Sequence, residues 1–466
     1  MPKPILVLQM QRMGDLILSF PLFLWLKRLY PKTPIWTVAE KDFYSQLMGI
    51  SPQVTYIPWT GYRHVMDKRF SLVINLSHRE EAAWLAGQLD CEEVVGSFRD
   101  GHGALRINGD WQLYRASLVH NNRFNRFHWA DMNALDAVPP AKLAETRWSP
   151  PRRLTADNNS VGVFIGASQR DKRPGVEFWV SLLKSLIRRG LKPVIFGGPG
   201  EKELAGRIKS GLGLSLADFT GRTDLSQLVY MGQALQLLIT PDTGPMHLAA
   251  WSGLRVLNLS FGPVHPWETG PYQPGHLVLG SSRSCRRCWE CRFKYPFCRD
   301  DPDPVRVAGL ARAWIKGDKI PPDSAGVQLL RTGRSQGLYA LLPAGRENSR
   351  QRAGETLSAF WQAYWMYWFG VSGKKGVLQA QAGLRNTFPR VHAVLEREVK
   401  RLLSQMNSLI AKRNIPDMDF WKTCPPIFRP LRGYLQLYWQ NHDFDPGYIH
   451  RSLNQVEDFL AILQPD

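Results

Sequence analysis

Short apolar runs alternate with helical stretches along the first two thirds of this chain, and the alternation starts afresh near residue 160. Such alternation is typical of parallel sheets covered by helices on both faces. A segment rich in proline and charge, residues 139–159, separates the two rounds and predicts a linker. The predicted strands are residues 5–8, 34–39, 71–76, 161–165, 193–196, 237–240 and 254–259. The sequence therefore predicts an α/β protein with two doubly wound domains.

The sequence changes character after residue 326, where the strand pattern gives way to a helical, aromatic and basic segment. A chain of 466 residues is too long for one hydrophobic core. Residues 360–369 carry aromatic side chains on nearly every helical face, which favours a buried helix over a helix at a membrane interface. The predicted domains are residues 1–150, 151–326 and 327–466.

Basic residues outnumber acidic ones, 59 against 40, which gives a formal net charge of +19. A positive field favours anionic partners such as nucleic acid, acidic lipid surfaces or phosphorylated substrates, without choosing among them. No export signal and no apolar stretch long enough to span a bilayer stand out. We therefore expect a cytoplasmic protein, and the charge leaves open a peripheral contact with the inner face of the cytoplasmic membrane.

The turn after the predicted strand 237–240 carries the strongest local signal. It places Asp242, Thr243, Gly244 and His247 at the start of an apolar helix. Backbone N–H groups at a helix N-terminus attract phosphate, and a glycine there lets the main chain approach an anion closely. The alternative is an ordinary strand-to-helix turn in which Asp242 or Thr243 caps the helix.

Polar or glycine residues also follow the other predicted strands of the second round. Ser168, the pair 197–198 and Gly262 all lie where a strand ends. In open parallel sheets, ligands bind outside the carboxyl ends of the strands. Two such domains joined by a linker are expected to leave a ligand-binding cleft between them.

Four cysteines lie within fourteen residues, as Cys285-x2-Cys288-x2-Cys291-x6-Cys298. Four thiolates can hold a tetrahedral zinc ion or an iron centre. The spacing predicts a structural metal that fixes a basic loop, while free thiols or a disulfide pair are the alternatives.

Several separated blocks occur in an order that resembles the bacterial heptosyltransferase family, glycosyltransferase family 9, over roughly residues 4–315. The resemblance implies a GT-B fold, in which two Rossmann-like domains face one another, here followed by a C-terminal helical extension. It also implies an enzyme without a catalytic cofactor. The blocks are residues 12–16, 166–172, 197–201, 220–225, 242–247 and 261–263.

The resemblance also implies roles for individual residues. Asp15 matches the family's general base, although a helix N-cap is an equally ordinary role for an aspartate there. Lys172 matches a lysine that contacts the donor phosphates and offsets the charge of the leaving diphosphate. The residues expected to bind the donor nucleotide are Ser168, Glu201, Asp242, Thr243, Gly244 and His247. For Glu201, an exposed glutamate at a helix start is the alternative.

The predicted function is inverting transfer of a heptose from ADP-heptose to a hydroxyl of a lipopolysaccharide core-type acceptor. The basic surface suits such an anionic acceptor. One alternative is a heptosyltransferase that acts on protein of the autotransporter type. Another is a nucleic-acid-binding protein with a metal site formed by the four clustered cysteines, which leaves the turn at residues 242–247 unexplained. An inactive relative that serves as a scaffold is disfavoured, because Asp15 and Lys172 are retained.

Overall fold

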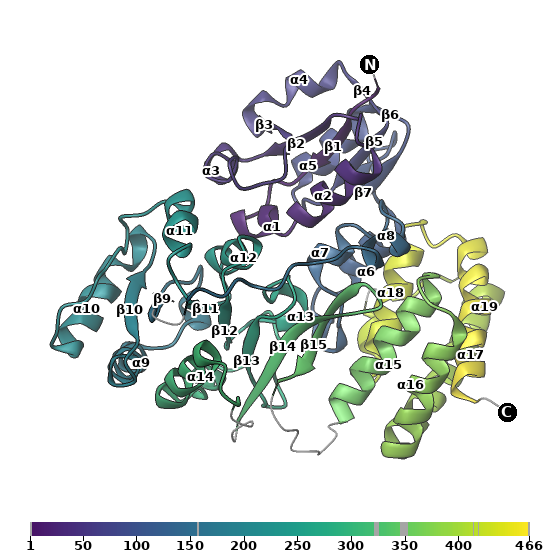
Figure 1. The fold of residues 1–466 in the computed structure, drawn as a ribbon. Coiled ribbons are helices and arrows are strands. Elements are labelled where there is room, and N and C mark those ends of the chain that lie inside the picture. The colour runs from purple at the N-terminus through teal and green to yellow at the C-terminus, as the bar shows by residue number, and fades with distance from the viewer. Residues whose placement is uncertain are drawn as a thin grey trace.

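The computed structural model describes residues 2–155, 158–320, 326–344, 353–412, 414–417 and 419–464. Two sheets flanked by helices form two lobes, and a bundle of C-terminal helices packs beside them (Figure 1). No helix in the described ranges is long and apolar enough to cross a membrane. The predicted α/β class with two doubly wound parts is therefore confirmed.

The N-terminal lobe contains a six-stranded sheet in the order β3-β2-β1-β5-β7-β8. All neighbours pair in parallel except β8, which is antiparallel to β7. The central strand β1 is buried along its whole length, as expected for a strand covered on both faces. The strands are β1 (Ile5–Leu8), β2 (Ile35–Ala39), β3 (Thr55–Pro58), β5 (Leu72–Asn75), β7 (Val94–Arg99) and β8 (Leu105–Asn108).

Two short helices connect β1 to β2 and lead from the sheet toward the second lobe. Helix α1 (Met13–Ile17) follows β1 directly, and α2 (Phe20–Leu29) buries an almost continuous apolar face. Helix α5 (Glu80–Gln88) packs on β7. The lobe continues into α6 (Asp110–Ser117), α7 (Trp129–Met132) and α8 (Pro140–Ala144).

The second lobe contains a seven-stranded sheet in the order β10-β9-β11-β12-β13-β14-β15. Its first five strands are parallel, and the last two add an antiparallel edge. The strands are β9 (Ser160–Phe164), β10 (Lys192–Phe196), β11 (Leu237–Pro241), β12 (Val256–Ser260), β13 (Leu277–Ser281), β14 (Val327–Ser335) and β15 (Leu338–Pro343). The main helices of this lobe are α9 (Val176–Arg188), α10 (Lys202–Leu212), α11 (Leu225–Gly232), α12 (Gly244–Trp251) and α14 (Pro304–Lys316).

The expectation of a purely helical segment from residue 327 is wrong for β14 and β15. These strands form a hairpin that extends the second sheet, with Arg331 paired to Leu277 of β13. The hairpin turns at Gln336 and Gly337, whose φ angles of 51° and 83° fit a two-residue turn that follows strand twist. The sequence does contain a hairpin signal here, because a glycine separates two short runs with alternating apolar residues. The long helical segment that follows led to the prediction of helix for the whole region.

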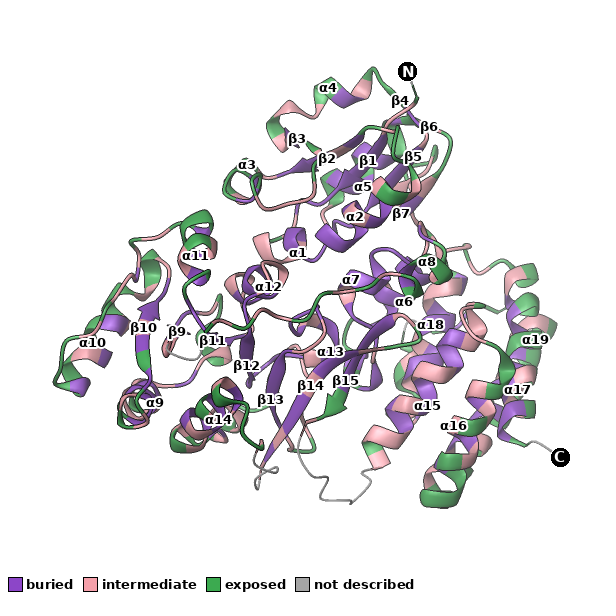
Figure 2. Ribbon diagram, in the orientation of Figure 1, coloured by how far each residue is buried: buried purple, intermediate pink, exposed green. Residues whose placement is uncertain are grey.

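Beyond the hairpin the chain is helical, as expected. The helices are α15 (Ala353–Trp368), α16 (Lys374–Thr387), α17 (Pro389–Lys412), α18 (Arg429–Gln440) and α19 (Pro446–Leu463). Helix α15 contains most of the aromatic run, and its Phe360, Trp361, Tyr364 and Trp365 are at most 1% exposed. The prediction that this helix is buried is confirmed (Figure 2).

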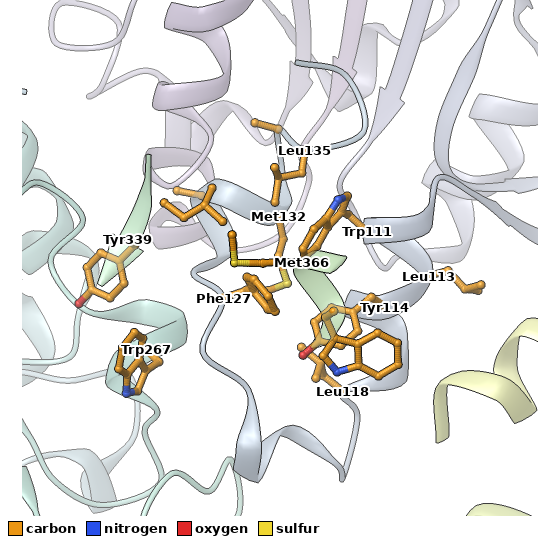
Figure 3. Close-up of a cluster of buried hydrophobic side chains, with 14 of the residues drawn as sticks. Trp111, Leu113, Tyr114, Leu118, Phe127, Met132, Leu135, Trp267, Tyr339 and Met366 are labelled. Atoms are coloured by element: carbon orange, nitrogen blue, oxygen red, sulfur yellow. The ribbon is translucent and has the colours of Figure 1, made fainter. Parts of the chain in front are cut away.

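The C-terminal helices share one hydrophobic core with the N-terminal lobe. Trp111 and Tyr114 of α6 contact Phe369, which follows α15, with ring centroids 4.9 Å and 6.0 Å apart. Trp267 and Tyr339 bring the second lobe against the same cluster (Figure 3). The extension is therefore packed into the body of the molecule rather than appended to it.

Trp365 is the aromatic residue through which α15 joins this core. It is fully buried and contacts the rings of Tyr114, Tyr434 and Phe369. Replacing Trp365 with alanine is expected to lower the free energy of unfolding by ~3–5 kcal/mol, because the change leaves a cavity among rigid rings. Urea unfolding followed by far-UV circular dichroism measures this difference.

Tyr30→Ala is the matched control, since Tyr30 is 42% exposed at the end of α2. Its expected cost is about 0.5 kcal/mol or less, as for an ordinary surface substitution. Equal losses in the two variants would contradict the assignment of Trp365 to the shared core.

Candidate active site

A cleft of about 870 Å³ lies between the two lobes, at the carboxyl ends of strands from both sheets. Residues after β1 form one wall, and residues after β9, β10, β11 and β12 form the other. The catalytic and donor-binding residues predicted from the sequence line this cleft: Asp15, Ser168, Lys172, Glu201, Asp242, Thr243, Gly244 and His247. Their placement agrees with the predicted site, while their individual roles stay predictions.

The two walls meet where α1 approaches α12. A Cβ atom on Gly14 would lie 3.5 Å from Cδ2 of His247, and one on Gly244 would lie 3.8 Å from the backbone nitrogen of Gly14. Both distances are ordinary van der Waals contacts, so the N-termini of α1 and α12 lie side by side across the boundary between the lobes. This contact brings Asp15 and His247 into one electrostatic environment.

Asp15 is the third residue of α1. Its Oδ2 accepts a hydrogen bond from the backbone N–H of Arg12 at 3.1 Å, so the carboxylate caps its own helix. Burial raises the pKa of Asp15 above its ordinary value of 3.8, while Arg115, the Arg12 N–H group and His247 oppose that rise. Asp15 is therefore not the N-cap, which is Arg12, but its carboxylate closes the capping box of α1 and also lines the cleft.

Arg115 is a residue that the sequence analysis missed. It is 5% exposed on α6, donates to Oδ1 of Asn133 at 2.9 Å and lies 4.9 Å from the ring centroid of Trp129. Its guanidinium group is the strongest influence that lowers the pKa of Asp15. No motif marks it, because it is far from Asp15 in the sequence and reaches the site only through the packing of α6.

His78 completes the surroundings of Arg115. Its Nε2 lies 3.3 Å from Nη2 of Arg115, and it lines the cleft. Burial and the positive charge of Arg115 lower the pKa of His78 to about 3, so its imidazole is neutral at physiological pH. The Arg115 guanidinium therefore has the neutral ring of His78 as a neighbour and acts electrostatically on the carboxylate of Asp15.

The turn before α12 is the part of the cleft that the second lobe contributes. Oγ1 of Thr243 accepts a bond from the backbone N–H of Met246 at 3.4 Å, which makes Thr243 the N-cap. Asp242 accepts a bond from Oγ1 of Thr269 at 2.7 Å and lies 3.9 Å from Nε2 of His247. The capping alternative is thus realised within a turn that also lines the cleft.

His247 is 7% exposed, and burial lowers its pKa below the ordinary value despite the nearby carboxylates of Asp242 and Asp15. A neutral imidazole carries one N–H donor and one acceptor. Among the described residues, Nδ1 of His247 has no hydrogen-bond partner. That nitrogen is itself buried, while the residue as a whole lines the cleft.

The loop that carries Lys172 is held by a glycine. Lys172 ends a 3-10 turn (Arg170–Lys172) after β9, and the backbone of Asp171 packs against Gly262. Gly262 has a φ of +84°, and a Cβ atom there would overlap the carbonyl oxygen of Asp171. The same Gly262 N–H group donates to Sγ of Cys298 at 3.3 Å. One backbone position therefore supports both the loop that carries Lys172 (the Lys172 loop) and the segment of residues 282–300 that contains the four clustered cysteines (the cysteine loop).

Glu201 has protein partners of its own. Its Oε2 accepts from the backbone N–H of Gly198 at 2.9 Å, and its Oε1 lies 3.5 Å from Nη1 of Arg173. A Cβ atom on Gly166 would lie 2.8 Å from the Glu201 carboxyl carbon. The carboxylate thus closes the turn at residues 198–201 and lines the cleft as well.

The four clustered cysteines line a second cavity, of about 660 Å³. Burial, followed by the neighbouring thiols, raises the pKa of Cys288 to about 11, and Cys298 accepts the Gly262 N–H bond. The described residues contain no group of three or more His, Cys, Asp or Glu side chains placed to hold a metal ion. The four thiols share this cavity and influence one another electrostatically, and the zinc or iron site at Cys285, Cys288, Cys291 and Cys298 stays a prediction.

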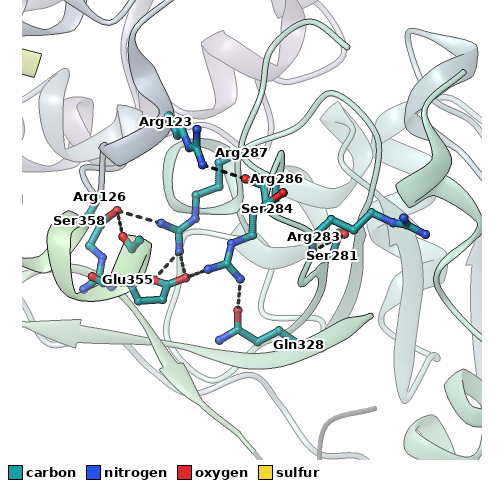
Figure 4. A network of polar contacts seen from close by, with 11 residues as sticks. Arg123, Arg126, Ser281, Arg283, Ser284, Arg286, Arg287, Gln328, Glu355 and Ser358 are labelled. Carbon is teal, nitrogen blue, oxygen red and sulfur yellow. Dashed lines mark hydrogen bonds and ion pairs between the residues drawn. The ribbon is translucent and has the colours of Figure 1, made fainter. Parts of the chain in front are cut away.

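Ion pairs hold the base of the cysteine loop in place (Figure 4). Arg286, Arg287 and Arg126 all pair with Glu355 at the start of α15. Burial would raise the pKa of Glu355, but Arg287, Arg286 and Arg126 hold it well below its usual range. The carboxylate is thus ionised, and it links the loop to the C-terminal helices and to the N-terminal lobe.

Trp289 of the same loop lies between the two cavities and lines both. Its Nε1 donates to Oε2 of Glu268 at 2.6 Å, and Asn125 donates to Oε1 at 2.9 Å. Burial raises the pKa of Glu268 to about 7, against these hydrogen bonds. The cysteine loop is therefore part of the wall of the cleft.

Comparison with known proteins agrees with this arrangement. The model of glycosyltransferase family 9 (heptosyltransferase) matches residues 61–295, just over half of the chain. Lipopolysaccharide core heptosyltransferase OpsX of Haemophilus influenzae is 21% identical over 295 residues, which cover 58% of this chain and 82% of that protein. Lipooligosaccharide heptosyltransferase 2 of Haemophilus ducreyi is 22% identical, over 59% of this chain and 88% of its own length.

Among solved structures, ADP-heptose lps heptosyltransferase II of Escherichia coli superposes with a TM-score of 0.52. It is 20% identical, and the match covers 67% of this chain and 99% of that one. This likeness supports the GT-B arrangement of two facing Rossmann-like lobes. The family match and the two-lobed fold together show that this chain belongs to glycosyltransferase family 9, the heptosyltransferases, and is a glycosyltransferase.

Proposed function

We propose that this enzyme transfers a heptose from ADP-heptose to a hydroxyl group of a lipopolysaccharide core-type acceptor, with inversion at the anomeric carbon. The observation that carries the proposal is the position of Asp15 on one wall of the cleft, opposite the turn at residues 242–247 on the other. The relatives named as lipopolysaccharide or lipooligosaccharide heptosyltransferases support the choice of donor and acceptor.

In the proposed reaction Asp15 removes the proton from the acceptor hydroxyl. The acceptor oxygen forms a bond to the anomeric carbon as the bond from that carbon to the phosphate oxygen breaks, and ADP leaves with the electron pair. A base with a raised pKa is a stronger proton acceptor than an exposed aspartate, which favours this step. Arg115 opposes the rise and so favours the ionised carboxylate that the step requires.

The diphosphate is proposed to bind on the opposite wall. Lys172 supplies a positive charge there, Ser168 a hydroxyl group, and the start of α12 a partial positive charge. His247 is neutral and can donate a hydrogen bond to a phosphate oxygen. Positioned donors of this kind stabilise the charge that develops on a leaving group, each by roughly 3–4 kcal/mol.

Removing the proposed base tests this assignment. Asp15→Asn is expected to lower turnover by ~10²–10⁴-fold, because an amide cannot accept the acceptor proton. The amide oxygen can still accept the Arg12 N–H bond, so the thermal stability and the affinity for ADP should change little. The measurement is product formation from ADP-heptose, followed by mass spectrometry.

Asp42→Asn is the control, since Asp42 is an exposed carboxylate on the same lobe, in α3 (Lys41–Tyr44). It should keep wild-type turnover. A folded Asp15→Asn enzyme with near wild-type turnover would remove Asp15 from the base role.

The pH dependence gives a second test. Because the carboxylate form of Asp15 is the active one and its pKa is raised, kcat/KM should fall on the acid side with an apparent pKa above 3.8. Arg115 lowers the pKa of Asp15, so Arg115→Gln should move this acid limb to higher pH, whereas Arg115→Lys should leave it near the wild-type position.

The control for the pH profile is Arg79→Gln, because Arg79 pairs with Glu40 away from Asp15. Its acid limb should coincide with that of the wild type. An Arg115→Gln profile that stays in place, or moves to lower pH, would contradict the proposed coupling.

The Lys172 loop can be displaced without touching a charged group. Gly262→Ala places a methyl group against the carbonyl oxygen of Asp171 and should push the loop away from the cleft. We expect a loss of about 10²-fold in kcat/KM, the size expected for a misplacement of about 1 Å at a reacting centre. Steady-state kinetics and calorimetric titration with ADP measure the effect.

Gly213→Ala is the control for Gly262→Ala, because it introduces the same kind of backbone strain without a steric collision. Gly213 has a φ of +70° at the end of α10, and a Cβ atom there has no neighbour within 4 Å among the described residues. It should cost stability, about 1 kcal/mol, and leave kcat/KM unchanged. Similar kinetics for both alanine variants would show that the Gly262 contact does not position Lys172.

A further inference from the structure

The cysteine loop exposes three aromatic side chains within five residues. Phe293, Tyr295 and Phe297 are 42%, 38% and 52% exposed. The Phe297 ring centroid lies 5.7 Å from that of Phe293 and 5.6 Å from that of Tyr295, so the rings form one patch. Large aromatic residues normally bury most of their surface, and an exposed group of them marks an interaction site. We call residues 292–297 the aromatic tip.

Positive charge accompanies the aromatic tip. Arg292 and Lys294 are exposed, and Arg292 lies 4.9 Å from the ring centroid of Phe293. Neither side chain forms an ion pair within the described parts of the chain. At the base of the loop the charges are already paired, since Arg286 and Arg287 bind Glu355 and Arg283 binds Asp301. The unpaired charge of the loop is thus concentrated beside the exposed rings.

We propose that the aromatic tip docks this enzyme on an anionic lipid surface. Tyrosine favours the headgroup region of a bilayer because its ring is amphipathic, and phenylalanine is among the apolar residues that interfacial segments bury at the boundary with the acyl chains. Each lysine or arginine close to an anionic bilayer strengthens binding roughly fivefold. Stable peripheral attachment needs two such signals, and the aromatic tip combines an apolar signal with a basic one.

The position of the loop connects docking with the cleft. Trp289, four residues before Phe293, lines the cleft and is held by Glu268. The base of the loop is fixed through Glu355, so the aromatic tip has a defined position relative to the cleft. Docking would therefore hold the cleft at the bilayer surface, where a lipid-linked acceptor lies; this purpose, but not the lipid binding itself, rests on the proposed function.

A nucleic-acid partner fits the aromatic tip less well. Bases bind to proteins by stacking on flat, accessible aromatic faces. Here the Phe297 ring meets both neighbours edge to face, with interplanar angles of 65° in each case. The Tyr295 ring is also covered by Arg299, whose guanidinium carbon lies 4.6 Å from the ring centroid. The patch offers apolar edges, which suit insertion among headgroups.

The test is co-sedimentation of the full-length protein with vesicles. Vesicles of phosphatidylglycerol and phosphatidylethanolamine should bind the wild type at least tenfold more tightly than vesicles of phosphatidylcholine, and added salt should weaken the binding. The double variant Phe293→Ser/Phe297→Ser should lose about tenfold or more of the anionic-vesicle affinity. The double variant Arg292→Gln/Lys294→Gln should lose most of the difference between the two kinds of vesicle.

Tyr230→Ser is the matched control, because Tyr230 is 81% exposed on α11 and lies outside the loop. It should bind vesicles as the wild type does. A thermal melt and ADP titration check that each variant is folded. Equal vesicle binding by wild type and both loop variants would overturn the proposal, as would a wild type that ignores anionic vesicles at low salt.

Two further measurements distinguish a failure of the lipid-docking proposal from a failure of the proposed reaction. Asp15→Asn should bind vesicles normally, since the vesicles contain neither donor nor acceptor. Loop-dependent vesicle binding without any consumption of ADP-heptose would leave the docking intact and refute the proposed reaction. Loop variants that lose oligonucleotide binding but keep vesicle binding would identify the aromatic tip as a nucleic-acid surface and refute the lipid proposal.

Discussion

The contact between α1 and α12 is the constraint on which the cleft depends. Gly14 and Gly244 face one another across the boundary between the lobes, where a Cβ atom added to either would be in ordinary van der Waals contact with the other helix. The ring of His247 is buried there, and the carboxylate of Asp15 is part-buried at the wall of the cleft. Burial raises the pKa of the acid and lowers the pKa of the imidazole. Both shifts have the same physical origin, because burial disfavours the charged form of either group.

The relative position of the lobes depends on more than this contact. Asp131 of α7 is fully buried, and it accepts hydrogen bonds from the Tyr272 hydroxyl group and from the backbone N–H of Tyr339 in β15. Arg334 of β14 lies 3.5 Å from the same carboxylate. A hairpin of the second lobe thus satisfies a buried charge of the first, and the aromatic core of α15 lies against both. The β14–β15 hairpin and α7 therefore join the two lobes through a buried carboxylate, and α15 packs into the same core.

The sequence was sufficient to predict the elements that depend on local pattern. Buried parallel strands such as β1 and β11 follow from apolar runs, and the turn at residues 242–247 follows from a glycine and polar residues at a strand end. Arg115 could not be predicted, because its influence on Asp15 depends on how α6 packs against β7, β8, α7 and α18. The β14–β15 hairpin was missed although its glycine turn was visible. Cysteine spacing indicated metal ligands, and the structure places the four thiols around one cavity, so the metal stays a prediction.

Gly262 shows how the cysteine loop and the donor side of the cleft depend on one another. Its missing side chain admits the backbone of Asp171, and its N–H group bonds to Cys298, so the Lys172 loop and the cysteine loop share a support. At its other contact the cysteine loop presents Trp289 to Glu268, whose pKa of about 7 makes that carboxyl group the most readily titrated of the groups that hold the loop. A displacement of the loop at one end would therefore be felt at the Lys172 loop through a single backbone position. Gly262 therefore joins the loop that carries the aromatic tip to the Lys172 loop at the wall of the cleft.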